Sequence, residues 1–145
     1  MVLEFHPHLY VMNRDGTGKR RLTPQEGWID AVAWSPTGEW IAFEQSSAVW
    51  VVKPDGSESR KIADTPIEYH WRLYTAQPVW SPDGRRIAFV APGVGAEKNA
   101  DIFIINADGS GLFNLTQHPA DDFQPAWSPD GRYIAFVTTR DGKKD

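Results

Sequence analysis

The chain has 145 residues, of which 41% are hydrophobic and 23% are charged, a composition typical of one globular domain and unlike that of a disordered segment. A formal net charge of −4 provides no basic field for a phosphate backbone, so we expect no nucleic-acid partner. The absence of Cys excludes disulfides and thiol chemistry, and residues 1–10 lack the apolar run of a signal peptide or a membrane span, so no membrane partner is expected.

The first predicted element is a hairpin over residues 9–23. Its strands, 9–13 and 20–23, are joined by a turn that contains Asp15-Gly16, and Gly supplies the positive φ that such a turn needs. The basic run Lys19-Arg20-Arg21 lies beside the turn, and we interpret it as a solvated strand edge rather than a nucleic-acid patch.

Two repeated units follow at residues 30–63 and 76–116. Each begins with a strand that ends at a Trp, Trp34 or Trp80, and a turn of Ser-Pro and Gly then leads into Ile-Ala-Phe. A third strand then turns through Asp-Gly into a fourth, in the same pattern as residues 9–23. Runs of about five residues between Pro and Gly are too short for helices, so each unit is predicted to contain four antiparallel strands.

The last predicted element, residues 123–138, repeats only the first half of a unit. Trp127-Ser128-Pro129-Asp130-Gly131 precedes Ile134-Ala135-Phe136, which predicts two strands and a tight turn. The chain therefore contains two full units between two complementary halves.

The third strands indicate how the units are arranged. Val49-Trp50-Val51-Val52 and Ile102-Phe103-Ile104-Ile105 are apolar on both faces, so both faces of each sheet have to be covered. No helical pattern is available as a cover, and the cover must be another sheet on each side. The predicted fold class is all-β: a β-propeller of four-stranded antiparallel blades, with three blades' worth of strands in the chain.

The Trp-Ser-Pro-Asp-Gly and Ile-Ala-Phe motifs, with Tyr10-Val11-Met12-Asn13-Arg14-Asp15-Gly16 and Arg21-Leu22-Thr23, resemble the repeat of TolB-like propellers. The resemblance implies a ring whose first strands line a central channel. It also implies a periplasmic or extracytoplasmic location. Relatives of this kind include a periplasmic protein that docks an outer-membrane lipoprotein and propeller domains that gate prolyl-oligopeptidase-type peptidases.

Three blades are too few to close a ring, since propellers have about 4 to 8. We therefore expect a homodimer in which the half blade 123–138 of one chain joins the half blade 9–23 of another, giving six blades. The alternative is that the chain is a fragment of a longer propeller-containing protein, a prolyl-oligopeptidase-like hydrolase or a lyase.

The predicted function is a non-catalytic scaffold for self-assembly or for binding another protein or peptide. No Gly-x-Ser-x-Gly motif occurs, and no nucleophile lies at a motif spacing from the four histidines (His6, His8, His70 and His118). No cofactor and no metal are expected, because Asn13-x-Asp15 and Asn106-Ala107-Asp108 are typical of hairpin turns and lack the Glu of a calcium loop.

Two groups of residues are the candidates for specific roles. Trp34, Trp80 and Trp127 occupy the same repeat position and are predicted to anchor neighbouring blades. A segment that breaks the repeat combines aromatic and charged side chains and is the predicted recognition surface; its residues are Glu68, Tyr69, His70, Trp71, Arg72 and Tyr74.

Overall fold

A computed structural model describes residues 7–23, 27–65, 76–93 and 99–140. Every regular element in these ranges is a β-strand. The strands are β1 (Tyr10–Val11), β2 (Arg20–Arg21), β3 (Ile29–Trp34), β4 (Ile41–Gln45), β5 (Ala48–Val52), β6 (Ser59–Asp64), β7 (Val79–Trp80), β8 (Arg86–Pro92), β9 (Ala100–Asn106), β10 (Phe113–Asn114), β11 (Asp122–Trp127) and β12 (Ile134–Thr138).

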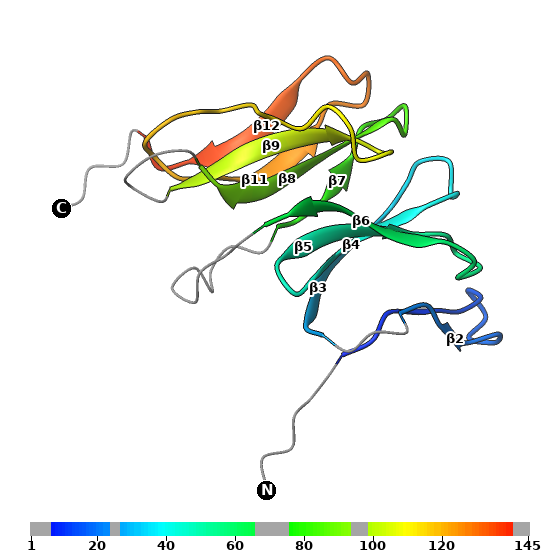
Figure 1. Cartoon of the computed structure of the whole chain (residues 1–145). Coiled ribbons are helices and arrows are strands. Elements are labelled where there is room, and N and C mark those ends of the chain that lie inside the picture. The colour runs from blue at the N-terminus through cyan, green and yellow to red at the C-terminus, as the bar shows by residue number, and fades with distance from the viewer. Residues whose placement is uncertain (1–6, 24–26, 66–75, 94–98, 141–145) are drawn as a thin grey trace, which may run out of the picture.

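The strands form two four-stranded sheets and two hairpins, all antiparallel. Sheet I has the order β3-β4-β5-β6 and sheet II the order β7-β8-β9-β10. The N-terminal hairpin (β1–β2) and the C-terminal hairpin (β11–β12) each remain two-stranded. Along the chain, the four follow one another as stacked layers (Figure 1).

The turn between the first and second strand of sheet II shows why the Ser-Pro-Asp-Gly motif recurs. The Ser81 hydroxyl donates to the Asp83 carboxylate at 2.6 Å and accepts the backbone N–H of Arg86 at 2.9 Å. Gly84 has a φ of 68°, a conformation that a residue with a Cβ adopts only at a cost. The motif thus closes the hairpin by hydrogen bonds within the turn itself, without a contribution from another layer.

Apolar clusters fill the space between successive layers. The largest lies between sheet I and sheet II and includes Val49 and Val51 from one and Phe89 and Ile105 from the other. A second joins the N-terminal hairpin to sheet I through Leu9 and other side chains, and a third joins sheet II to the C-terminal hairpin. Sheets I and II are therefore covered on both faces by other sheets, as the two-sided apolar strands predicted.

The all-β class and the antiparallel strands are confirmed, with β1, β2, β7 and β10 shorter than predicted. Residues 9–13 were expected to form one strand, but β1 pairs only through Tyr10 and Val11. At the start of this segment, the backbone N–H of Leu9 donates to the Thr23 hydroxyl at 3.0 Å instead of to a strand partner. The grouping of these sheets as blades of one ring stays a prediction.

Candidate protein-binding groove

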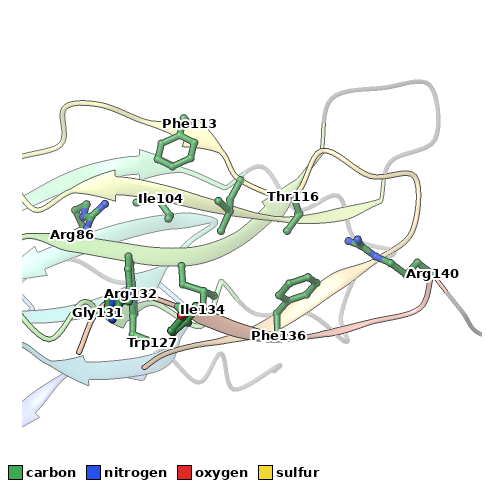
Figure 2. A pocket seen from close by; sticks show the side chains of 12 residues that line it. Arg86, Ile104, Phe113, Thr116, Trp127, Gly131, Arg132, Ile134, Phe136 and Arg140 are labelled. Atoms are coloured by element: carbon green, nitrogen blue, oxygen red, sulfur yellow. The ribbon is translucent and has the colours of Figure 1, made fainter. Parts of the chain in front are cut away.

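A groove of about 670 Å³ lies between sheet II and the C-terminal hairpin. Ile104 of β9, Phe113 of β10 and the following Leu115 line one wall. Ile134 and Phe136 of β12, among others, line the opposite wall. Figure 2 shows Ile104 and Phe113 on one side of the groove and Ile134 and Phe136 on the other. The lining of the groove is more apolar than polar, and the groove is open to solvent.

The groove exists because β12 has a partner on one side only. It pairs with β11, whereas the equivalent strands β4 and β8 are each paired on both sides. The exposed fraction of the repeated Phe records the difference: Phe43 and Phe89 are 0% and 1% exposed, and Phe136 is 37% exposed. The groove therefore lies beside the C-terminal hairpin, in the place that a third and a fourth strand occupy in sheets I and II.

The sheet II wall shows the same lack of cover. Leu115 holds the repeat position of Ile62, because Asn114-Leu115-Thr116 corresponds to Lys61-Ile62-Ala63. Ile62 packs between sheets I and II and is 8% exposed, whereas Leu115 is 39% exposed. An apolar side chain that is buried in one repeat and uncovered in the next marks a surface suited to another apolar element.

Arginine side chains surround the aromatic part of the groove. The guanidinium of Arg86 lies 5.2 Å from the centre of the Trp127 ring, and that of Arg140 lies 5.4 Å from the centre of the Phe136 ring. Arg140 also binds both carboxylate oxygens of the buried Asp122, at 3.0 and 2.8 Å. Aromatic and arginine side chains together are the composition of protein-binding hot spots.

The opposite end of the stack presents a second uncovered surface. On the N-terminal hairpin, Leu9 is buried against sheet I, while Tyr10 and Met12 are 48% and 61% exposed. Trp34, at the end of β3, is 51% exposed. The two ends of the described chain thus each carry large exposed apolar side chains, and each end has a strand edge without a partner among the described residues.

The three repeated Trp side chains differ in their surroundings. Trp80 is buried between the sheets, and its indole N–H donates to the backbone carbonyl of Ala33 in β3 at 3.1 Å. Trp127 packs partly buried against sheet II. Trp34 has no such cover, because the N-terminal hairpin lacks an inner strand equivalent to β3. A general anchoring role for this Trp position stays a prediction.

Carboxylates at the turns have lowered pKa values with a structural cause. The hydroxyl and backbone N–H of Thr17 hold the pKa of Asp15 below its ordinary value, and Ser110 does the same for Asp108. The same hydrogen bonds support the interpretation of these segments as hairpin turns. No group of three or more His, Asp or Glu side chains suited to a metal ion occurs within residues 7–23, 27–65, 76–93 and 99–140.

The predicted recognition surface, Glu68, Tyr69, His70, Trp71, Arg72 and Tyr74, lies outside the described residues. The groove residues were not predicted as a site. The sequence held one signal for the groove. Phe136 and Leu115 occupy repeat positions whose other side chains (Phe43, Phe89 and Ile62) are buried. In the described part of the chain, no helix is long and apolar enough to span a membrane.

Comparison with known proteins shows that residues 8–145 match the TolB beta propeller domain family. Tol-Pal system protein TolB of Anaeromyxobacter dehalogenans is 33% identical over 119 residues, which cover 79% of this chain and 25% of that protein. Protein TolB homolog of Chlorobium luteolum is 32% identical over 105 residues, 69% of this chain and 21% of that protein. The chain therefore spans about a quarter or less of the length of these two relatives.

Solved structures give the same fold. TolB from Acinetobacter baumannii superposes with a TM-score of 0.72 at 20% identity, covering 93% of this chain and 33% of that one. Oligogalacturonate lyase from Vibrio parahaemolyticus superposes with a TM-score of 0.67 at 14% identity, covering 92% and 39%. At these identities the likeness concerns the propeller fold alone, which supports both binding proteins and enzymes.

Proposed function

We propose, from the premise that this chain belongs to the TolB β-propeller domain family, that it is a non-catalytic module that binds protein chains through its open strand edges. The first such partner is a second copy of the same chain. Two copies joined head to tail complete a six-bladed ring, in which the C-terminal hairpin of each copy and the N-terminal hairpin of the other form one blade.

One observation carries this proposal: the two open ends are complementary halves of the same repeated sheet. The C-terminal hairpin corresponds to the first and second strands of sheets I and II, and the N-terminal hairpin corresponds to the third and fourth. Side by side, they supply all four strands in the order that sheets I and II have. Each hairpin then covers the edge that the other leaves unpaired.

The uncovered side chains provide the driving force. Burying an exposed aromatic or aliphatic side chain contributes about 1.5–3 kcal/mol, and each seam covers several, including Tyr10, Met12, Phe136 and Leu115. Association costs on the order of 4–15 kcal/mol in lost rigid-body freedom. These side chains are only partly exposed, so each contributes part of that amount, and the strand hydrogen bonds gained at the two seams add to it. On this basis we expect a dimer at micromolar concentration.

The perturbed carboxylates named here have structural causes. Hydrogen bonds within turns account for the lowered pKa values of Asp15, Asp55, Asp83, Asp108 and Asp130. Burial accounts for the raised pKa of Glu44, which accepts a backbone hydrogen bond. A non-catalytic role is supported by the name of the Anaeromyxobacter relative, Tol-Pal system protein TolB, which is not that of an enzyme.

The mass in solution tests the proposal. Light scattering at micromolar concentration is expected to give twice the chain mass of 16.3 kDa. Phe136→Lys, which places a charge on the β12 edge, is expected to shift the mass to that of a single chain. Leu112→Lys is the matched control, because Leu112 is 52% exposed and lies outside the groove. A single-chain mass for the unmodified protein overturns the dimer.

A further inference from the structure

The pairing between second and third strands has the same register in both four-stranded sheets. In sheet I, Ile41 pairs with Val52 and Phe43 with Trp50. In sheet II, the equivalent residues pair in the same way: Ile87 with Ile105 and Phe89 with Phe103. Since the register is a property of the repeat, it also defines how any equivalent strand would add to β12.

The sequence supplies such a strand in the N-terminal hairpin. Residues 9–13 precede Asp15-Gly16 as residues 49–53 precede Asp55-Gly56, so Tyr10 corresponds to Trp50 and Met12 to Val52. On β12, Ile134 and Phe136 correspond to Ile41 and Phe43. Transferring the register pairs Ile134 with Met12, Ala135 with Val11, Phe136 with Tyr10 and Val137 with Leu9.

The alternation of side chains in β1 agrees with this placement. Leu9 and Val11 face sheet I, where they contact the cluster around Phe43 and Val52. Tyr10 and Met12 lie on the other face of the strand, because successive side chains of a strand point to opposite sides. In sheet II, the equivalent Phe103 and Ile105 pack against sheet I. The exposed face of β1 therefore carries the two side chains that this position requires.

We propose, on the basis of the proposed function, that Tyr10 and Met12 of a second copy fill the groove. In this arrangement β1 of the second copy pairs with β12, so that Tyr10 lies opposite Phe136 and Met12 lies opposite Ile134. Ile104 and Leu115 then receive the cover that Val51 and Ile62 receive from Phe103 and Ile105.

A second contact follows from the same arrangement at the inner end of the seam. Within the chain, Trp80 of sheet II donates to the carbonyl of Ala33, the residue before Trp34 on the first strand of the preceding sheet. The sheet formed at the seam would consist of β11 and β12 of the first copy and β1 and β2 of the second. It would precede sheet I of the second copy and have β11 as its first strand. The half-exposed Trp34 of that copy would then donate to the carbonyl of Ala126, the residue before Trp127.

Cysteine crosslinking tests the register directly, because the natural chain contains no Cys. Arg86 pairs with Asn106, and the equivalent pair across the seam is Tyr133 with Asn13. Both are exposed. A mixture of the Tyr133→Cys chain and the Asn13→Cys chain is expected to form a disulfide-linked dimer under mild oxidation, since paired strand residues lie within disulfide reach. Neither variant oxidised alone is expected to do so.

The matched control is Val137→Cys mixed with Asn13→Cys. Val137 is exposed, as Tyr133 is, but it lies in β12, four residues further along the chain. Little crosslinked product is expected from it. Preferred crosslinking of the control pair, or of either variant alone, overturns the register. A dimeric mass in light scattering without crosslinking of Tyr133→Cys to Asn13→Cys overturns this inference and leaves the proposed dimer in place. A single-chain mass overturns both.

Discussion

The indole N–H of Trp80 donates to the carbonyl of Ala33 across 3.1 Å, and this hydrogen bond joins the first strand of sheet II to the first strand of sheet I. The two residues are far apart in the sequence and lie in adjacent layers. The bond therefore shows that the two sheets lie close together at their first strands, β3 and β7.

Replacing Trp80 by Phe is expected to lower the free energy of unfolding by about 1–3 kcal/mol, because a hydrogen bond is lost and the smaller ring leaves a void. Urea unfolding measures this loss. Trp28→Phe is the control, since Trp28 is 61% exposed and its replacement is expected to change stability by less than about 0.5 kcal/mol. Equal losses in the two variants would contradict an anchoring role for Trp80.

Glu44 is expected to make stability depend on pH. Its side chain is 6% exposed, accepts the backbone N–H of Ala76 at 2.6 Å, and has a pKa raised above 4.5, first by burial and to a smaller extent by Asp30. The folded state thus favours the protonated form. The stabilising contribution of protonation is complete below pH 4.5 and is lost as the pH rises through the folded-state pKa.

Glu44→Gln removes this titration and keeps an oxygen acceptor for Ala76. Relative to the unmodified chain, the variant is expected to gain stability between about pH 4 and pH 7, as measured by urea unfolding at both values. Glu44→Leu, which leaves the Ala76 N–H without its acceptor, is expected to lose about 1–3 kcal/mol. A Gln variant whose relative stability falls over the same pH range would show that ionised Glu44 is favoured instead.

Ser81→Ala is expected to destabilise the chain by about 1–3 kcal/mol, because the buried hydroxyl bonds the Asp83 carboxylate and the Arg86 N–H at once. Ser128 makes the same two kinds of bond, to Asp130 and to Tyr133, but on the more exposed C-terminal hairpin. Ser128→Ala is therefore expected to cost less. Thermal unfolding of the two variants side by side checks the order, and a larger loss for Ser128→Ala would reverse it.

Arg140→Ala is expected to destabilise the C-terminal hairpin, because it leaves the carboxylate of Asp122, which is 0% exposed, without its cation. Breaking a buried ion pair costs about 3–5 kcal/mol, and the 32% exposure of the Arg140 side chain places the expected loss at about 2–3 kcal/mol. Adding Asp122→Asn removes the buried charge and is expected to restore part of it. Urea unfolding of the single and the double variant checks this. If Arg140→Ala acts through lost packing instead, Asp122→Asn is expected to restore no stability.

The sequence predicted the strands well because their signals are local. Gly84 and its equivalents specify turns, and adjacent apolar residues such as Val51 and Val52, which pack on opposite faces, indicate which strands are buried on both faces. The same local signals could not predict the groove. Phe136 has the motif of Phe43 and Phe89, and only its position at the end of the sheet stack leaves it exposed.

Trp34 illustrates the same point at the other end. Its motif is that of Trp80, yet the two differ in burial because a neighbouring first strand contacts one and not the other. Repeat position predicts what a side chain can contact, and the neighbouring layer decides whether it does. The ion pair of Arg140 with Asp122 joins residues outside the repeated motifs, so no sequence pattern predicted it.

The open edges of β1 and β12 belong to opposite ends of the stack, so the proposed pairing of β12 with β1 of another copy joins two different surfaces. Such contacts end in a closed ring only if the rotation from layer to layer returns to its origin after a whole number of copies. A small change in that rotation, introduced where two layers meet, would convert a closed assembly into a growing helical filament.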